Sequence, residues 1–256
     1  MAPTKISRRK LFRLGVGATI GLFILEPFVL EPYWLKVKRL NIGGSNASHR
    51  IVHITDIHYK GDRLYLKKVV ETVNALSPDF VCFSGDLVES ATYVNEALEI
   101  LSSIQRPVYS VPGNHDYWSG ASFDTISQYC QSTGGAWLLD RDTLTQDGQI
   151  QIIGATGNQP QLPPPQQALK RILLVHYPLF VEQVKETFDL ILAGHSHGGQ
   201  VRLPFWGALF LPYRVGSYDL GLFETKVGPL YVNPGIGTFL FPVRSWCRPE
   251  ITVIEL

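Results

Sequence analysis

The histidines and aspartates of this 256-residue sequence gather in short blocks that lie far apart along the chain. Imidazole nitrogens and carboxylate or amide oxygens are ligands that first-row divalent metal ions accept. A centre of two such ions needs ligands from several loops and one carboxylate that can bridge the ions. The blocks are Asp56-Ile57-His58, Gly85-Asp86, Gly113-Asn114-His115-Asp116, His176 and Gly194-His195-Ser196-His197. Their residue types indicate a binuclear metal site.

Each block begins where a short apolar run ends, and runs of this length are typical of buried strands. Ligands in open α/β sheets gather at the carboxyl ends of strands, so we expect the blocks to converge on one point. If the segment after the first run stays extended, the side chains of Asp56 and His58 would point to the same side of it. The runs that precede the blocks are 51–55, 80–83, 108–111, 172–175 and 190–193.

The rest of the pattern predicts the elements that position these blocks. Apolar residues recur at helical spacing at 64–76 and 93–104, between the first three predicted strands. Further predicted strands in the C-terminal third are separated only by turns. These further strands are 220–223, 229–232 and 251–254, and one more strand is predicted earlier in the chain, at 150–153. We expect an α/β fold, a two-sheet sandwich flanked by helices, in one domain from 45 to 256.

In their order along the chain, the blocks resemble the motifs of the calcineurin-like metallophosphoesterase family across nearly the whole predicted domain. The ordered set is specific, whereas a single Gly-Asp or His-x-His is common by chance. The resemblance implies two bound divalent metal ions, and the ligand types are compatible with Mn, Fe or Zn. It assigns Asp56, His58, Asp86 and His197 to the first ion, and Asp86 as the bridge, Asn114, His176 and His195 to the second.

The resemblance also implies a reaction. A hydroxide that bridges the ions would attack the phosphorus in line, while the ions draw charge from the non-bridging oxygens. His115 would protonate the leaving oxygen or stabilise its charge, and Asp116 would orient the His115 imidazole. The implied function is metal-dependent hydrolysis of a phosphoester, and we expect a phosphodiester as the substrate.

Two other functions stay open. The C-terminal stretches 218–224, 231–237 and 244–251 resemble the bacterial branch of membrane-associated or exported phosphodiesterases in this family. Some relatives of that branch split the pyrophosphate of nucleotide-linked acylated sugars, so a pyrophosphatase acting on a lipid precursor is an alternative. The third function is a non-catalytic, metal-stabilised binding module. A module of that kind would be expected to lack His115 or a ligand, and the sequence retains all of them.

The stretch between Asn114 and His176 is too short for a separate cap domain, so we expect an open site. The loop 198–213, which follows the histidine pair, is rich in large apolar side chains. It could pack locally, wall the site for a lipid-linked phosphoester, or touch a bilayer. Arg202 and Arg214 are candidates for binding a second phosphate.

Residues 1–40 predict a targeting or anchoring segment. Ser7-Arg8-Arg9-Lys10-Leu11-Phe12 resembles a twin-arginine export signal with its last two residues in swapped order. The uncharged run 14–25 has the length of a signal h-region rather than of a full span. No small-x-small cleavage site follows, and Tyr33-Trp34 is typical of an interfacial belt. We expect an uncleaved anchor at the outer face of the cytoplasmic membrane, with the cytoplasmic face as the alternative.

The charge distribution argues against one class of partner, and the cysteines bear on possible disulfides. Five of the 23 basic residues precede Glu26, the first acid, which leaves 18 basic against 22 acidic residues. A mildly acidic body lacks the broad basic surface that nucleic-acid binding uses, so no nucleic-acid partner is expected. Cys82 lies in an apolar run and predicts a buried thiol. The sequence leaves open whether Cys130 and Cys247 pair, and it does not determine the oligomeric state.

Overall fold

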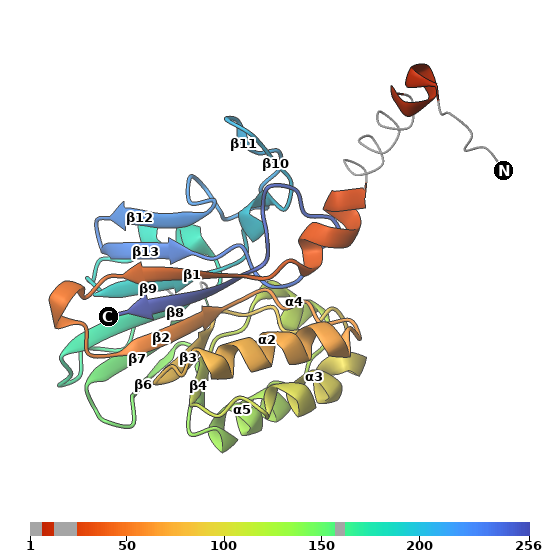
Figure 1. The fold of residues 1–256 in the computed structure, drawn as a ribbon. Helices are drawn as coiled ribbons and strands as arrows, with labels where there is room; N and C mark the ends of the chain where they lie inside the picture. The colour runs from red at the N-terminus through yellow and green to blue at the C-terminus, as the bar shows by residue number, and fades with distance from the viewer. Residues whose placement is uncertain (1–6, 13–24, 157–161) are drawn as a thin grey trace.

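The computed structural model describes residues 7–12, 25–156 and 162–256. In these residues the strands form two six-stranded sheets and a separate two-stranded hairpin. Figure 1 shows the sheets together with α2, α3 and α5 on one side of the body and the β10–β11 hairpin above it. The predicted mixed α/β fold with two sheets is confirmed.

The first sheet has the strand order β1–β14–β2–β3–β4–β5. Strands β2, β3, β4 and β5 run parallel to one another, and β14 lies antiparallel to β2 and parallel to β1. The polar blocks that follow β2, β3 and β4 therefore lie at the same edge of this sheet. The strands are β1 (Lys36–Asn41), β2 (Arg50–Ile54), β3 (Phe80–Phe83), β4 (Val108–Ser110), β5 (Ala136–Trp137) and β14 (Glu250–Glu255).

The second sheet has the strand order β12–β13–β9–β8–β7–β6. Strands β7, β8, β9 and β13 are parallel, and an antiparallel strand closes each edge. The strands are β6 (Arg141–Leu144), β7 (Ile150–Ala155), β8 (Lys170–Val175), β9 (Leu190–Ala193), β12 (Gly221–Thr225) and β13 (Gly228–Val232). The hairpin outside both sheets consists of β10 (Arg202–Leu203) and β11 (Gly207–Ala208).

The helices cover the first sheet. Helix α2 begins after Asp62, whose side chain accepts a hydrogen bond from the Tyr65 backbone N–H at 3.0 Å. The predicted helical spacings correspond to α2 and α3. The α-helices are α2 (Arg63–Ala75), α3 (Val94–Leu101), α4 (Asn114–Trp118) and α5 (Phe123–Ser132). Shorter helical turns are η1 (Glu26–Leu30), η2 (Glu31–Tyr33), η3 (Gly44–Asn46), η4 (Ala91–Tyr93), η5 (Pro178–Glu182) and η6 (His197–Gly199).

Three buried apolar layers hold these elements together. Side chains such as Ile152 and Leu174 of the second sheet meet Ile51 of the first sheet between the two sheets. Val70 of α2 belongs to the layer between the first sheet and the helices. Phe180 of η5 belongs to the layer on the outer face of the second sheet. Both sheets are thus buried on both faces, which explains the continuous apolar runs in their strands.

Residues 36–40, which we assigned to the N-terminal targeting segment, belong to strand β1 at the edge of the first sheet. The folded body therefore begins before residue 45. The Lys36 ammonium lies 2.8 Å from the buried carboxylate of Glu250, and Lys38 lies over the Tyr231 ring. Cations are common on edge strands, where they oppose pairing with another chain. In this chain Lys36, Lys38 and Arg39 follow Tyr33-Trp34, and this combination is also typical of an interfacial belt. The sequence therefore did not reveal strand β1.

The predicted apolar run of the targeting segment, residues 14–25, lies almost entirely outside the described residues. Among the helices that the structure describes, none combines the length and the apolar composition that crossing a membrane requires. All three cysteines are buried and free, so Cys130 and Cys247 do not pair.

Arg244 stabilises the segment that passes beneath the carboxyl ends of the first sheet. Its side chain is fully buried and donates hydrogen bonds to the backbone carbonyls of Pro234, Gly235, Gly237 and Cys247. The guanidinium thereby replaces the water that these carbonyls would otherwise bind. One side chain therefore fixes the path of the chain around residues 234–247.

We expect Arg244→Met to lower the free energy of unfolding by about 3 kcal/mol or more, because it leaves buried carbonyl oxygens without a donor. Urea unfolding followed by circular dichroism measures this loss. Arg50→Met is the matched control, since Arg50 contacts Glu255 on the surface. Equal midpoints for the two variants would contradict the role assigned to Arg244.

Candidate metal centre

The structure places the predicted site residues at the facing carboxyl ends of strands from both sheets. From the first sheet, β2, β3 and β4 lead directly into the loops that carry the first three blocks. From the second sheet, β8 leads to His176, and β9 leads to His195 and His197. Parallel strands whose ends meet in this way can direct side chains from five loops to one point.

Asp56, His58 and His197 form one cluster, and all three are buried. The Nε2 atoms of His58 and His197 lie 3.0 Å apart. The His197 Nε2 atom lies 3.3 Å from Asp56 Oδ1, and the His58 Nε2 atom lies 3.7 Å from the same oxygen. One carboxylate and two imidazole nitrogens thus surround a single position.

Asp86, His176 and His195 form a second cluster. The His176 Nε2 atom lies 3.3 Å from Asp86 Oδ2 and 3.2 Å from His195 Nδ1. Asn114 Oδ1 lies 3.0 Å from the same His176 nitrogen. Asp86 Oδ2 is also 3.4 Å from His58 Nε2 in the first cluster. The Asp86 carboxylate therefore lies between the two clusters, where a bridging ligand must be.

The backbone at these positions is strained. Asp56, His58, Asp86, His195 and His197 all have positive φ, between 44° and 67°. For residues other than glycine this conformation costs about 1–3 kcal/mol each, and it persists at sites where function demands it. Within the part of the chain that the structure describes, the buried His197 Nδ1 has no hydrogen-bond partner. Strain, buried charge and closely spaced imidazoles together fit a site for divalent metal ions, and the N/O donor set suits Mn, Fe or Zn.

Three of these histidines have an oxygen acceptor on the ring nitrogen that points away from the centre. A donor–acceptor contact of this kind fixes the tautomer and the orientation of a metal-binding imidazole. The pairs are His58 Nδ1 with Glu89 Oε1 (2.6 Å), His176 Nδ1 with the Ser84 carbonyl (2.8 Å) and His195 Nε2 with the Tyr213 carbonyl (2.7 Å). With a metal ion bound, each ring would present its other, unprotonated nitrogen to the centre.

Burial and neighbouring charge compete at the centre. Burial disfavours protonated His58, but the carboxylates of Asp56, Glu89 and Asp86 together outweigh burial and raise the pKa of His58 to about 10. In the same way Asp86 raises the pKa of His176 to about 9. Burial raises the pKa of the Asp86 carboxyl, but His176 and His58 together outweigh burial and bring that pKa to about 2. Burial, assisted by His176, lowers the pKa of His195 to about 4. The ionised carboxylates thus need positive charge beside them.

The structure corrects the role predicted for Asp116. Its carboxylate accepts hydrogen bonds from the backbone N–H groups of Asp86, Leu87 and Gly113 at 2.8–2.9 Å, rather than orienting the His115 imidazole. Burial and then the neighbouring Asp86 raise the pKa of Asp116 to about 6. Asp116 therefore ties together the loops after β3 and β4.

Glu89 contacts His115 instead. One Glu89 oxygen lies 3.4 Å from His115 Nδ1, and the other is the acceptor for His58. The carboxylate thus joins a predicted metal ligand to the predicted general acid. The sequence signal for this residue is weak, because Glu89 follows Asp86 by three positions in a loop and resembles any exposed acid.

Two pockets open beside the centre, and both are lined by His197 and Phe239. The first, of about 370 Å³, is lined further by Asn114, Trp118, Tyr177, His195, Pro212, Tyr213 and Arg214. The second, of about 260 Å³, is almost entirely apolar, and its walls include Leu209, Phe210, Leu240, Phe241 and Val243. The two pockets meet at His197 and Phe239 and leave room beside the centre for two substituents of a bound substrate.

The two arginines predicted to bind phosphate differ in their surroundings. Arg214 lines the first pocket, and its guanidinium carbon lies 4.8 Å from the centroid of the Tyr177 ring. Arg202 instead donates at 2.8 Å to the Asp219 carboxylate and to the Gly198 carbonyl. Because Arg202 is already paired, Arg214 is the better candidate for contacting substrate.

Comparisons with known proteins agree with this geometry. A family model described as calcineurin-like phosphoesterase matches residues 49–199. The chain is 31% identical to the phosphodiesterase YaeI of Escherichia coli, over 98% of this chain and 99% of that protein. It is 29% identical to the uncharacterized metallophosphoesterase YkuE of Bacillus subtilis, over 98% of both proteins.

Among solved structures, TT1561 of Thermus thermophilus is similar at a TM-score of 0.46 and 12% identity, over 73% of this chain and 90% of that one. The family match covers all the blocks of the centre, from Asp56 to His197. This chain belongs to the calcineurin-like phosphoesterase family and is a hydrolase of phosphoesters.

Proposed function

We propose that this enzyme hydrolyses phosphodiesters at a centre of two divalent metal ions. The observation that carries the proposal is the place of the Asp86 carboxylate, which lies within 3.4 Å of imidazole nitrogens from both clusters. A carboxylate shared by two sets of ligands is what a pair of metal ions requires.

The residues that would hold the ions follow from the two clusters. Asp86 would bridge them, and the ions when bound would supply a water of lowered pKa and would neutralise charge on the phosphoryl oxygens. The first ion would be held by Asp56, His58, Asp86 and His197, and the second by Asp86, Asn114, His176 and His195.

The chain itself would move the proton to the leaving group. Glu89 faces His115 Nδ1 at 3.4 Å and favours a proton there, so that Nε2 can exchange a proton with the leaving oxygen. Trp118 and Phe239 pack against the His115 ring at 5.1 and 5.2 Å between ring centroids. These aromatic side chains restrict the imidazole to one orientation and keep water from it.

A diester suits this site better than a monoester, because two pockets meet at His197 and can hold both substituents. Arg214 in the first pocket could contact a phosphate or other anionic group of one substituent. The relative from Escherichia coli is named a phosphodiesterase. The apolar character of the second pocket keeps the pyrophosphatase acting on an acylated, nucleotide-linked sugar as the second candidate.

The test is hydrolysis of bis-p-nitrophenyl phosphate and of p-nitrophenyl phosphate by metal-stripped protein, with Mn²⁺, Fe²⁺, Zn²⁺ or Mg²⁺ added separately. We expect a first-row ion to restore turnover and the diester to react faster than the monoester. Asp86→Asn should lower kcat/KM roughly 10³-fold, because it weakens the bridge.

His49→Gln is the matched control for this test. His49 is buried at the opposite end of β2, where it contacts Ser48 and Asp147. Its substitution should leave turnover near the wild-type value. The proposal fails if no metal ion restores turnover, or if Asp86→Asn is as active as His49→Gln.

We expect Glu89→Gln to lower kcat about 10- to 100-fold and to raise the metal concentration that gives half-maximal activity, since Glu89 orients both His58 and His115. Metal titrations of steady-state rates measure both effects. Glu99→Gln on α3 is the control, because Glu99 is exposed and contacts only Arg63 among charged groups of the described chain. Identical titrations for the two variants would show that Glu89 positions neither histidine.

A further inference from the structure

Large apolar side chains are exposed together at the end of the molecule that carries the metal centre. Most exposed side chains of this kind in the described chain come from three segments, 28–34, 203–213 and 240–246, which we call the apolar surface. They are Phe28, Val29, Leu30, Tyr33, Trp34, Leu203, Phe205, Trp206, Leu209, Phe210, Tyr213, Leu240, Phe241 and Trp246. Soluble monomers rarely leave so much apolar surface contiguous.

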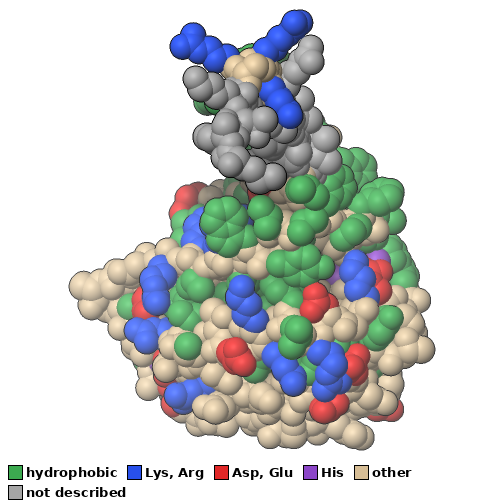
Figure 2. Space-filling model, turned by 45° about the vertical axis from the view of Figure 1, so that its right-hand side comes forward, with side chains coloured by type: hydrophobic (Ala, Val, Ile, Leu, Met, Phe, Trp, Pro, Cys, Tyr) green, Lys and Arg blue, Asp and Glu red, His purple; other side chains and the backbone are tan. Residues whose placement is uncertain are grey.

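Backbone hydrogen bonds join the three segments into one surface. The Arg244 N–H donates to the Pro27 carbonyl at 2.8 Å, which ties the last segment to the first. The Arg202 N–H donates to the Ser245 carbonyl, and the Ser245 N–H donates to the Gln200 carbonyl, both at 2.8 Å. In Figure 2 hydrophobic side chains gather in the upper part of the molecule, whereas charged side chains are scattered over the lower part.

The β10–β11 hairpin is the most exposed part of the apolar surface. Figure 1 shows it projecting from the body beyond both sheets. Phe205 and Trp206 occupy its tip, and 86% of Trp206 is accessible to solvent. A tip of this composition gains free energy when it leaves water. Tryptophan favours the boundary between lipid and water, because its ring is apolar and its N–H needs a polar partner.

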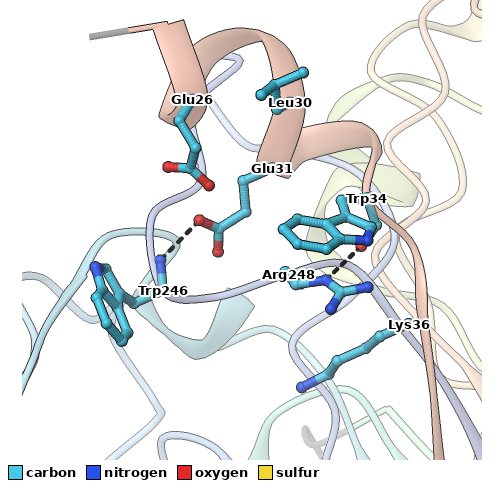
Figure 3. A pocket seen from close by; sticks show the side chains of 7 residues that line it. All are labelled: Glu26, Leu30, Glu31, Trp34, Lys36, Trp246 and Arg248. Atoms are coloured by element: carbon cyan, nitrogen blue, oxygen red, sulfur yellow. Dashed lines mark hydrogen bonds between the residues drawn. The ribbon is translucent and has the colours of Figure 1, made fainter. Parts of the chain in front are cut away.

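A pocket of about 550 Å³ marks the rim of the apolar surface (Figure 3). It is lined by Leu30, Trp34 and Trp246, by the cations Lys36 and Arg248, and by the acids Glu26 and Glu31. Lys36 is paired with Glu250, so Arg248 is the cation that this pocket offers to a ligand. The Arg248 guanidinium lies 4.1 Å from the centroid of the Trp34 ring. The acid Glu31 in this pocket is occupied, since it accepts hydrogen bonds from the backbone N–H groups of Trp246 and Cys247. Tryptophan and cations side by side are the composition of a headgroup-level belt.

The sequence that directly precedes the apolar surface indicates which partner covers this surface. Residues 14–25 contain no charge and lead directly into η1, where the surface begins. Basic residues precede this run, among them Arg8, Arg9 and Arg13. A long apolar run beside clustered cations matches a bilayer with anionic lipids, in which acyl chains and phosphates lie next to each other.

We propose that the apolar surface docks on an anionic phospholipid bilayer, with the hairpin tip in the acyl region and Trp34, Trp246 and Arg248 among the headgroups. The second pocket of the centre opens between Phe210 and Phe241 of this surface and reaches His197. Docking would therefore hold the metal centre close to the headgroup layer, a consequence that rests on the proposed hydrolysis.

The test uses the full chain in vesicles of phosphatidylglycerol and phosphatidylcholine. Phe205→Cys is labelled with the environment-sensitive dye NBD, and the native cysteines stay unlabelled because all three are buried. Some vesicles carry lipids with a doxyl quencher in the acyl chain. We expect the emission at position 205 to shift to shorter wavelength and to be strongly quenched by the doxyl lipid.

Leu169→Cys is the matched control. Leu169 is 79% exposed and lies at the end of β8 opposite His176, so a dye there should neither shift nor be quenched. An N-terminal anchor alone would leave both positions alike, and equal responses at 205 and 169 would overturn the proposal. A shift at 205 that grows with protein concentration without doxyl quenching would also overturn it, in favour of a second copy.

Hydrolysis of bis-p-nitrophenyl phosphate, measured on both labelled variants, separates this proposal from the proposed function. Neither position lines the pockets of the metal centre, so turnover of this soluble substrate should equal that of the wild type. Quenching at 205 without any turnover would leave docking intact and refute only the phosphodiesterase. Turnover without quenching at 205 would refute membrane docking and leave the phosphodiesterase proposal intact.

Discussion

The burial of several carboxylates beside closely packed imidazoles is the constraint on which the rest of the structure depends. Asp56, Asp86 and Asp116 are all removed from water. An isolated buried carboxylate costs several kcal/mol, so each needs a partner. Asp116 accepts hydrogen bonds from backbone N–H groups, which fix the loops. Asp56 accepts from the Thr55 hydroxyl and the His195 N–H, and Asp86 accepts from the His115 N–H, but both carboxylates also lie against histidine nitrogens that crowd one another. Bound metal ions would resolve this conflict and would account for the strained backbone of the same loops.

The fold provides what this arrangement requires from either side. Two sheets with buried faces bring the ends of five strands together and hold them rigidly. The segment around residue 235 passes beneath Asp56, where Gly235 leaves no room for a side chain, since a Cβ there would lie 2.7 Å from the Asp56 Cβ. Arg244 holds this segment by its carbonyls. The segment that Arg244 holds continues into residues 240–246 of the apolar surface. Arg244 therefore stabilises both the metal centre and this surface.

The sequence predicted the strands that lead into the site and the helices α2 and α3, because a sheet buried on both faces produces continuous apolar runs. It failed where a role depends on packing between distant segments. Strand β1 carries the cations that are common on edge strands, and its place in the sheet becomes clear only from its pairing with β14. Glu89 acts through contacts with His58 and His115, which spacing does not encode. Asp116 neighbours His115 in sequence, yet its side chain points to another loop.

Anomalous X-ray diffraction from crystals soaked in Mn²⁺ would test the central claim most directly, because it locates metal ions without reference to activity. The account predicts two peaks roughly 3.5–4 Å apart on either side of the Asp86 carboxylate. One should lie beside Asp56 and His197, and the other beside His176 and His195. A single peak, or none at these residues, would contradict the binuclear centre.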